Sequence, residues 1–249
     1  MTDNANIILK IKGLSIAFGS NVVLNNFNLE LVKGENIVVL GKSGSGKSVL
    51  IKCIVGLLKP NKGNIYVFGT NILELDQESL DKIRTKIGFL FQNSALYDSM
   101  TVRENLEFPM RRHWISLTPS EVNYLVEESL DNVGLLHAIN MMPSELSGGM
   151  RKRIGIARTL IMKPQLILYD EPTTGLDPIT SREIVQLMLD LQNKYHTSSV
   201  IISHDMSVAK LTANKIIVLL DGKNYAEGTY DELKKSSDKN INQFFEFAS

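Results

Sequence analysis

Residues Gly41-Lys-Ser-Gly-Ser-Gly-Lys-Ser48 decide the fold that this sequence predicts. The stretch matches the pattern G-x-x-x-x-G-K-[ST], follows the apolar run 36–40 and opens a segment with helical periodicity at 46–58. Glycines in such a loop let the backbone curl, so that successive N–H groups and the helix N-terminus face phosphates. We therefore expect a strand, a phosphate-binding loop and a helix in immediate succession.

Each residue type in this loop suits phosphate. Lys47 adds a point charge at the β- and γ-phosphates, and the hydroxyl of Ser48 can ligate Mg²⁺. The residues expected to cradle the phosphates are Gly41, Ser43, Gly44, Ser45 and Gly46, together with Lys47 and Ser48.

Strand-like and helix-like segments alternate along the rest of the chain. Short runs rich in β-branched residues predict strands, and longer runs with a 3.6-residue period predict helices. The expected strands are 7–11, 29–32, 36–40, 64–67, 87–91, 166–169, 199–202 and 215–220, and the expected helices are 46–58, 119–133, 147–162, 180–194 and 206–212. This alternation indicates an α/β fold with a mainly parallel central sheet.

Two regions depart from the alternation. The first 35 residues or so and residues 64–68 have strands without helices, which predicts an N-terminal antiparallel β subdomain. Residues from about 95 to 155 show no clear strand, which predicts an inserted helical subdomain. No linker rich in Gly, Pro or Ser is visible, so we expect one domain over 1–249 with a C-terminal tail at about 229–249.

A second strand ends in two carboxylates. Leu166-Ile-Leu-Tyr-Asp170-Glu171 places both acids after an apolar run, at the ligand-facing end of a parallel sheet. Phosphoryl transfer depends on positioning and charge stabilisation. We expect Asp170 to hold Mg²⁺ and Glu171 to polarise the attacking water.

A second anion site is predicted where a long helix begins. Ser147, Gly148 and Gly149 open the helix, and Arg151, Lys152 and Arg153 follow. Exposed N–H groups and the positive end of a helix dipole favour phosphate. Because one phosphate-binding loop does not need two such sites, the second is expected to serve the nucleotide of another subunit.

With these motifs in order, the chain resembles an ATP-binding cassette (ABC) ATPase over nearly its whole length. The resemblance identifies Phe18 as the aromatic residue stacking on adenine, Gln92 as the Q-loop residue that also reaches Mg²⁺, 146–150 as the signature, Asp177 in the D-loop and His204 as the switch histidine. Taken alone, Gln92 reads as a surface residue, His204 as a structural histidine and Phe18 as a core side chain. Their order relative to the strong motifs favours the functional reading.

The resemblance implies ATP and Mg²⁺ as ligands, with Glu171, His204 and Gln92 acting in catalysis. It also implies a homodimer in which each ATP lies between the phosphate-binding loop of one subunit and Ser147, Gly148 and Gly149 of the other. A separate integral membrane permease is the expected partner.

A subfamily is suggested by Met150, which stands where the family most often has Gln. Together with 91–97, 100–105, 108–109, 147–153 and 173–181, it resembles the ATPases of Mla/Mce-type lipid transporters. This implies phospholipid or related cargo, an Mce-type lipid-binding protein, a small accessory subunit and a peripheral location on the cytoplasmic face of the inner membrane. An amino acid or a lipoprotein remains an alternative cargo.

Composition excludes several other classes. The 27 basic residues balance 27 acidic ones, which argues against a partner made of nucleic acid. The single cysteine, Cys53, requires no oxidising compartment. No run reaches the roughly 20 apolar residues of a membrane-spanning helix, and the acidic start at 1–8 is unlike a signal peptide.

Two further alternatives remain open. A soluble ABC ATPase acting on DNA or ribosomes usually has a long coiled coil before the signature or two cassettes per chain, and a P-loop kinase or GTPase has no use for the second anion site.

Residues 93–112 follow Gln92 and contain many apolar groups, so they are the expected permease contact. Packing of those groups beneath the helical subdomain is the alternative.

Overall fold

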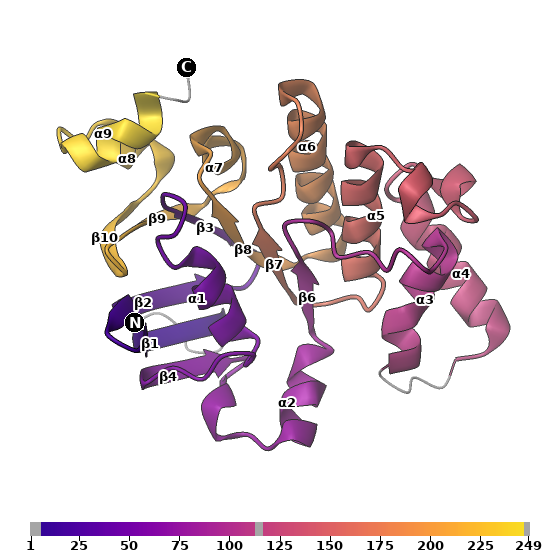
Figure 1. Cartoon of the computed structure of the whole chain (residues 1–249), viewed down its shortest axis with the longest axis horizontal. Coiled ribbons are helices and arrows are strands. Elements are labelled where there is room, and N and C mark those ends of the chain that lie inside the picture. Colours follow the sequence, from indigo (N-terminus) through magenta and orange to yellow (C-terminus); the bar gives the residue numbers. More distant parts are fainter. Residues whose placement is uncertain (1–5, 113–116, 247–249) are drawn as a thin grey trace. The chain divides into compact units, whose positions relative to one another are not determined.

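The computed structural model describes residues 6–112 and 117–246 (Figure 1), and its contacts group the chain into two compact units, Met1–Arg84 with Thr197–Ser249 and Thr85–His196. Expectations about the acidic start and the last residues of the tail fall partly on 1–5 and 247–249, outside the described residues. The single domain, the subdomain limits and the tail boundary stay predictions.

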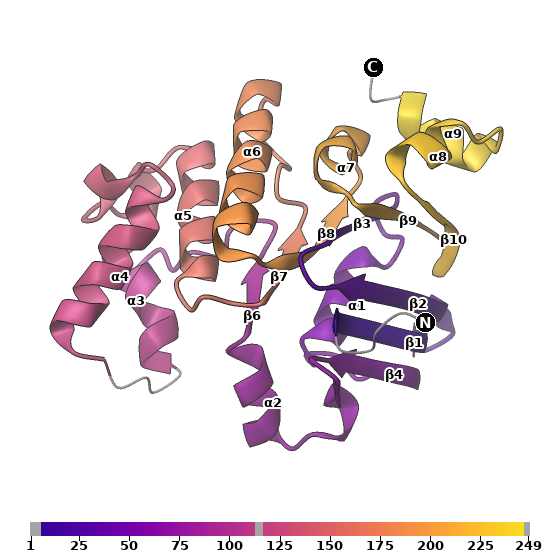
Figure 2. The same ribbon diagram turned by 180° about the vertical axis from the view of Figure 1, so that it is seen from behind.

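The first unit contains the expected antiparallel sheet, with strand order β2-β1-β4-β5. Its strands are β1 (Ile7–Phe18), β2 (Asn21–Val32), β4 (Lys62–Val67) and β5 (Thr70–Asn71), with every pair antiparallel (Figure 2). β1 and β2 are longer than predicted because register shifts and polar residues mask the period-two pattern. At one irregularity Gly13 has φ 62°, and its N–H donates to Asn28 Oδ1 at 2.9 Å.

A second sheet of the same unit has the order β10-β9-β3-β8. β3 (Asn36–Leu40) lies parallel to both β8 (Ser198–Ser203) and β9 (Lys215–Leu220), and β10 (Lys223–Gly228) runs antiparallel to β9. All residues of β3 and β8 are buried, as the apolar run 37–40 predicts for β3, and in β8 the burial includes three serines. The helices of this unit are α1 (Lys47–Ile54), α2 (Gln77–Arg84), α7 (Met206–Thr212), α8 (Tyr230–Lys234) and α9 (Lys239–Glu246), with a 3₁₀ turn at Ile72–Glu74.

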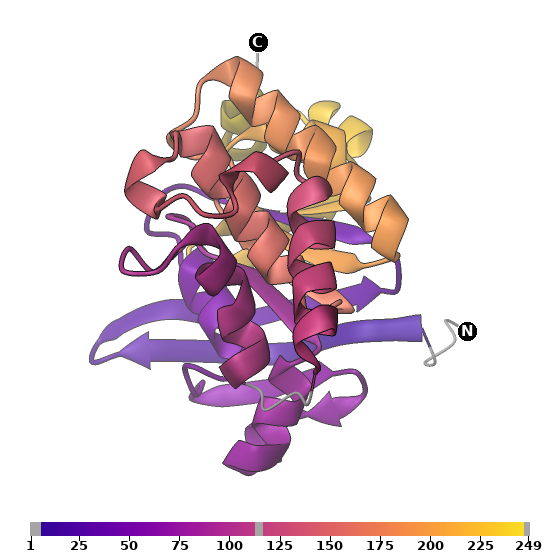
Figure 3. The ribbon, with the colours of Figure 1, turned by 90° about the vertical axis from the view of Figure 1, so that its right-hand side faces the viewer.

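The second unit is mainly helical. Its strands β6 (Ile87–Leu90) and β7 (Leu166–Asp170) pair in parallel. Its helices are α3 (Val102–Arg112), α4 (Pro119–Asp131), α5 (Gly148–Leu160) and α6 (Pro178–Tyr195), with 3₁₀ turns at Leu136–Ala138 and Pro143–Glu145 (Figure 3). In the described part of 95–155 the structure has helices and turns and no strand, as expected.

Several boundaries differ from the prediction. The helix expected over 46–58 ends at Ile54, because the chain turns at Gly56 with φ 69°. The prediction omitted α2, α3, α8, α9, β5 and β10. α2 buries only Leu80 and so shows no apolar stripe, and α3 contains Pro109, which in sequence argues against a helix. No helix in the described ranges combines the length and apolar character that a bilayer crossing requires.

A close approach of α5 to β6 organises the second unit. A Cβ added at Gly88 of β6 would lie 2.6 Å from Thr159 Cγ2 and 3.1 Å from Thr159 O, and one added at Gly155 of α5 would lie 2.8 Å from Leu90 Cδ1 and 3.0 Å from Ser94 Cβ. The helix therefore rests directly on the strand backbone. Any residue with a side chain at these positions forces the two elements apart.

We predict that Gly88→Ala destabilises the protein by about 1–3 kcal/mol, the usual cost of overpacking a tight interface. Thr159→Ser removes the methyl group in the way and keeps a hydroxyl. In the double variant it should return part of the lost stability. Denaturant titration of the full chain measures the four free energies of unfolding, and strictly additive costs would contradict this steric explanation.

Candidate nucleotide-binding site

The glycine-rich loop joins β3 to α1 in the first unit. A Cβ at Gly41 would lie 2.4 Å from Ser45 Oγ and 2.9 Å from Leu219 O, and one at Gly46, where φ is 102°, would lie 2.9 Å from Val23 O. Larger residues at these two positions would collide with neighbouring backbone or with the loop itself. The loop thus needs glycine for close approach as well as for backbone freedom.

The lysine of the loop is held inside it. Lys47 is only 6% exposed, and its Nζ donates to Gly41 O at 2.7 Å and to Lys42 O at 3.0 Å. Ser43, Gly44 and Ser48 are exposed at the rim of the loop. Two carbonyl groups of the loop therefore fix the position of the ammonium.

Ser45 has an unusual environment. Among the side chains that the structure describes, its Oγ is the one buried polar atom without a hydrogen-bond partner. A buried hydroxyl without a partner costs about 1–3 kcal/mol. A phosphate oxygen in the loop would supply the missing partner, so this orphaned atom fits the expected ligand.

Two more candidates lie in the same unit. His204 follows the last residue of β8, and its side chain is exposed just before Asp205 caps α7. Phe18 ends β1 and is 50% exposed. Phe18 is therefore not a core side chain, which leaves its ring available for stacking.

The two carboxylates lie at the end of β7 in the second unit. Every residue of β7 is buried, including Asp170 at 9% exposure. Glu171 has φ 50°, in the left-handed region that non-glycine residues rarely adopt, and its Oε2 accepts a hydrogen bond from Thr174 Oγ1 at 3.3 Å. Strained residues of this kind concentrate at functional sites.

Gln92 lies two residues beyond β6 and is exposed. Its carbonyl accepts a hydrogen bond from Lys152 Nζ, which also donates to Glu171 O at 3.3 Å. Burial lowers the pKa of Lys152 to about 8, while the nearby carboxylates of Asp170 and Glu171 raise it. One buried ammonium thus connects the main chains of two predicted catalytic residues.

Ser147 caps α5, with its Oγ accepting from Met150 N at 3.2 Å. Gly148 and Gly149 form the first turn, where a Cβ at Gly149 would lie 2.8 Å from Thr180 Cγ2. The basic residues that follow do not form an open patch. Arg151 donates to Pro143 O at 3.2 Å, Arg153 pairs with Glu183 at 2.9 Å, and Lys152 is buried, which leaves the hydroxyl and backbone N–H groups as anion donors.

Asp177 caps α6. Its Oδ1 accepts from Ile179 N and Thr180 N at 3.0 Å, and its Oδ2 accepts from Thr180 Oγ1 at 2.5 Å. These bonds, led by that of the Thr180 side chain, hold the pKa of Asp177 below its ordinary value. Its geometry is that of a helix cap, and its part in nucleotide binding stays a prediction.

Three polar side chains fix the segment after Gln92, and no local sequence pattern pointed to this role. Asn105 is fully buried, donating to the carbonyls of 97, 100 and 101 and accepting from Tyr97 N at 2.8 Å. Arg158 donates to Ser94 O at 2.7 Å and to Ala95 O at 2.8 Å. With Lys152, these residues resemble ordinary helix-surface polar residues in sequence, because only packing buries them.

Oxygen ligands suited to Mg²⁺ are present in each unit: the Ser48 hydroxyl in the first, and the Asp170 carboxylate and Gln92 amide in the second. The described residues contain no group of three or more His, Cys, Asp or Glu side chains arranged to hold a metal. Mg²⁺ bound with nucleotide needs one or two protein oxygens, and phosphates and waters complete its shell. Each unit therefore offers oxygen donors of the kind that a nucleotide-bound Mg²⁺ takes.

The model of the ABC transporter family matches residues 24–174. The probable ribonucleotide transport ATP-binding protein mkl of Mycobacterium leprae is 38% identical over 96% of this chain and 68% of its own length. The intermembrane phospholipid transport system ATP-binding protein MlaF of Haemophilus influenzae is 37% identical over 97% of this chain and 90% of its own. The methionine import ATP-binding protein MetN of Campylobacter jejuni is 36% identical over 91% of this chain and 72% of its own length.

A solved structure is similar throughout. The ATP-binding cassette MJ0796, as a dimer in a post-hydrolysis state bound to ADP and Pi, superimposes with a TM-score of 0.81 at 34% identity. The match covers 89% of this chain and 98% of that one.

We predict that Ser45→Ala has opposite effects on the free and the ATP-bound protein. Removing an unsatisfied buried hydroxyl leaves the free energy of unfolding equal or raises it by about 1 kcal/mol. Losing a phosphate hydrogen bond weakens ATP binding about 3–10-fold. Thermal unfolding and equilibrium binding measure the two effects.

Ser43→Ala is the control for the free protein, because Ser43 is exposed and its loss should leave stability unchanged. A less stable free Ser45→Ala protein, or unchanged affinity for ATP, would contradict the assignment of Ser45 to phosphate.

Proposed function

The chain belongs to the ABC transporter family of ATP-binding proteins, and from this premise we propose that it energises a separate membrane permease that moves phospholipid. It is an ATPase of that family. The observation that carries its nucleotide chemistry is the loop 41–48, with a lysine ammonium held within it and the buried Ser45 hydroxyl lacking a partner. Both features suit a bound phosphate.

In the proposed reaction, water attacks the γ-phosphorus, the bond to the β–γ bridging oxygen breaks, and ADP and inorganic phosphate leave. Lys47 binds the β- and γ-phosphates, and Glu171 orients and polarises the water. Ser48, Asp170 and Gln92 would hold Mg²⁺, which neutralises charge on the phosphates when bound. His204 contacts the γ-phosphate, and Phe18 stacks on adenine.

The second anion site supports a dimer. Ser147 and the first N–H groups of α5 offer donors that the chain's own phosphate loop does not require. The similar cassette MJ0796 forms dimers. We therefore propose that each nucleotide is shared between the loop 41–48 of one copy and Ser147, Gly148 and Gly149 of a second, with Asp177 close to the shared nucleotide.

Phospholipid is the favoured cargo because the likeness to MlaF extends over 90% of that protein and 97% of this chain. By analogy, the complex would lie on the cytoplasmic face of the inner membrane and include an Mce-type lipid-binding protein and a small accessory subunit. The likeness to MetN supports an amino acid as the second candidate cargo.

The segment after Gln92 supports a permease contact. Within 93–112, Leu106 and Met110 are buried in their unit. These two side chains therefore pack in the interior and are not part of the proposed contact. Tyr97 is 42% exposed and its ring lies 4.6 Å from that of Phe108, while Leu96 and Met100 are half-buried. Exposed aromatic and Met side chains are typical of interface residues.

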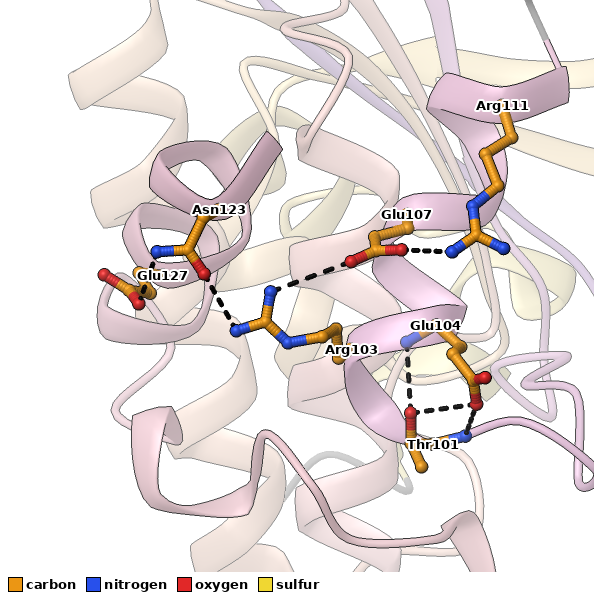
Figure 4. A network of polar contacts seen from close by, with 7 residues as sticks. All are labelled: Thr101, Arg103, Glu104, Glu107, Arg111, Asn123 and Glu127. Atoms are coloured by element: carbon orange, nitrogen blue, oxygen red, sulfur yellow. Dashed lines mark hydrogen bonds and ion pairs between the residues drawn. The ribbon is translucent and has the colours of Figure 1, made fainter. Parts of the chain in front are cut away.

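A polar network holds α3 against α4 beside this surface (Figure 4). Glu107 accepts a hydrogen bond from Arg111, and its Oε1 lies 3.7 Å from Nη1 of Arg103. Arg103 Nη2 in turn donates to Asn123 Oδ1 at 2.9 Å. A cavity of about 480 Å³ is lined by these residues and by apolar side chains such as Met110. The bond from Arg103 to Asn123 thus joins α3, which is part of the proposed contact segment, to α4.

We predict that Glu171→Gln keeps ATP binding and loses turnover by about 10²-fold or more, because the amide cannot accept a proton from water. The measurement uses the complex purified with its permease and reconstituted in vesicles. ATP-driven movement of a labelled phospholipid between vesicles should stop in this variant. Glu128→Gln, on α4, should leave transport unchanged.

Near-normal hydrolysis by Glu171→Gln would contradict the assignment of the water-orienting role. Turnover stimulated by methionine and not by phospholipid would reject the lipid cargo in favour of an amino acid.

We predict that Tyr97→Glu separates the chain from its permease while ATP binding stays within about twofold, because the charge enters an apolar contact and not the nucleotide site. Co-purification and equilibrium ATP binding measure the two properties. Tyr124→Glu is the matched control, since Tyr124 is 63% exposed on α4. A Tyr97→Glu protein that still co-purifies, or that no longer binds ATP, counts against the contact.

A further inference from the structure

Lys152 is a buried charge whose hydrogen bonds go to main-chain carbonyls. Its side chain lies in the second turn of α5 and the residue is only 5% exposed. Nζ donates to Gln92 O and, at 3.3 Å, to Glu171 O. A buried ammonium is costly unless its donors are satisfied, so this side chain is held to both carbonyls.

The bond to Glu171 acts on a strained residue. Glu171 has φ 50°, and its carbonyl accepts from Thr174 N at 3.3 Å as well as from Lys152. A left-handed non-glycine residue persists only where its surroundings hold it. Lys152 is one of the groups that hold the Glu171 peptide, and that peptide sets the direction in which the carboxylate leaves the chain.

The bond to Gln92 acts on a segment of irregular backbone. Ser94 and Ala95, just beyond it, have φ 59° and 47°. Arg158 holds their two carbonyls from the same helix, and Gly155 lets Ser94 approach. Lys152, Gly155 and Arg158 follow one another at spacings of three residues, so α5 fixes the chain at Gln92 and just beyond it.

We propose that Lys152 is a positioning residue for ATP hydrolysis, tying the main chains of Gln92 and Glu171 to the helix that begins at Ser147. The proposal rests on the catalytic roles given above to Gln92 and Glu171. A small shift of α5 on binding of an anion at Ser147 then moves both residues together. In the proposed dimer this connects occupancy of one nucleotide site to the catalytic groups of the other.

Loss of the ammonium need not break the unit. Thr159 Oγ1 donates to Phe89 O at 3.4 Å, and this bond and the close approach at Gly88 and Gly155 still hold α5 to β6. Arg158 still holds the segment beyond the strand. The hydrogen bonds of Lys152 lie within the second unit, whereas the loop 41–48 that binds phosphate in our proposal belongs to the first. Removal of the Lys152 ammonium should therefore reduce turnover and leave ATP affinity nearly unchanged. A general packing defect would instead lower turnover, ATP affinity and stability together.

The test compares Lys152→Met and Lys152→Gln in the full chain by ATPase rate, KM, equilibrium ATP binding and thermal unfolding. Met keeps about the length of the lysine side chain but has no hydrogen-bond donor. We expect its kcat to fall about tenfold or more, while the dissociation constant for ATP stays within about twofold of the wild-type value. Gln keeps N–H donors for one carbonyl and should give an intermediate kcat. Lys163→Met is the control, because Lys163 lies beyond the end of α5 with its side chain 58% exposed.

A kcat within about twofold of wild type for either variant would overturn the proposal, as would parallel losses of kcat, ATP affinity and melting temperature in Lys152→Gln. If Lys152→Met does not fold, Lys152→Gln decides by the same criteria. Failure of the proposed function is seen separately, since wild-type protein would then show no ATP hydrolysis or no phospholipid movement with its permease.

Discussion

The proposed nucleotide chemistry depends on the hydrogen bonds that hold the Lys47 ammonium inside its own loop. Two loop carbonyls hold it, and Gly41 and Gly46 let the loop come close enough to neighbouring backbone for this arrangement to form. The loop is in turn fixed at one end by β3, a fully buried strand between two parallel neighbours. A charge held in this way is ready for an anion before the anion arrives.

In the second unit, segments of irregular backbone are held in a fixed position. Residues with left-handed backbone follow both β6 and β7, at Ser94, Ala95 and Glu171. α5 supplies the groups that stabilise them, through Lys152 and Arg158, because glycines bring it onto the strand. One helix thus carries the proposed second anion site at its beginning and, along its length, the groups that contact the backbone of Gln92 and Glu171.

Local sequence predicted elements well where burial gives a simple pattern and poorly where it does not. The apolar run 36–40 forms a strand with the predicted limits, and the helix at 206–212 is likewise as predicted. The strand β10 and the helix α3 were omitted because their residues are largely polar, and pairing with β9 or packing against α4 and α5 stabilises them. Such stabilisation comes from distant parts of the chain.

By itself the sequence determined the phosphate loop, the acidic strand end and the helix start at Ser147, because each depends on residues adjacent in the chain. It also determined the ABC transporter family, since these motifs occur in one order. Only the tertiary structure decided that Phe18 is exposed, that Ser45 is buried without a partner, and that Lys152 points inward to the carbonyls of Gln92 and Glu171. Burial and hydrogen bonding of a side chain are set by neighbours far away in sequence, so a local pattern does not contain them.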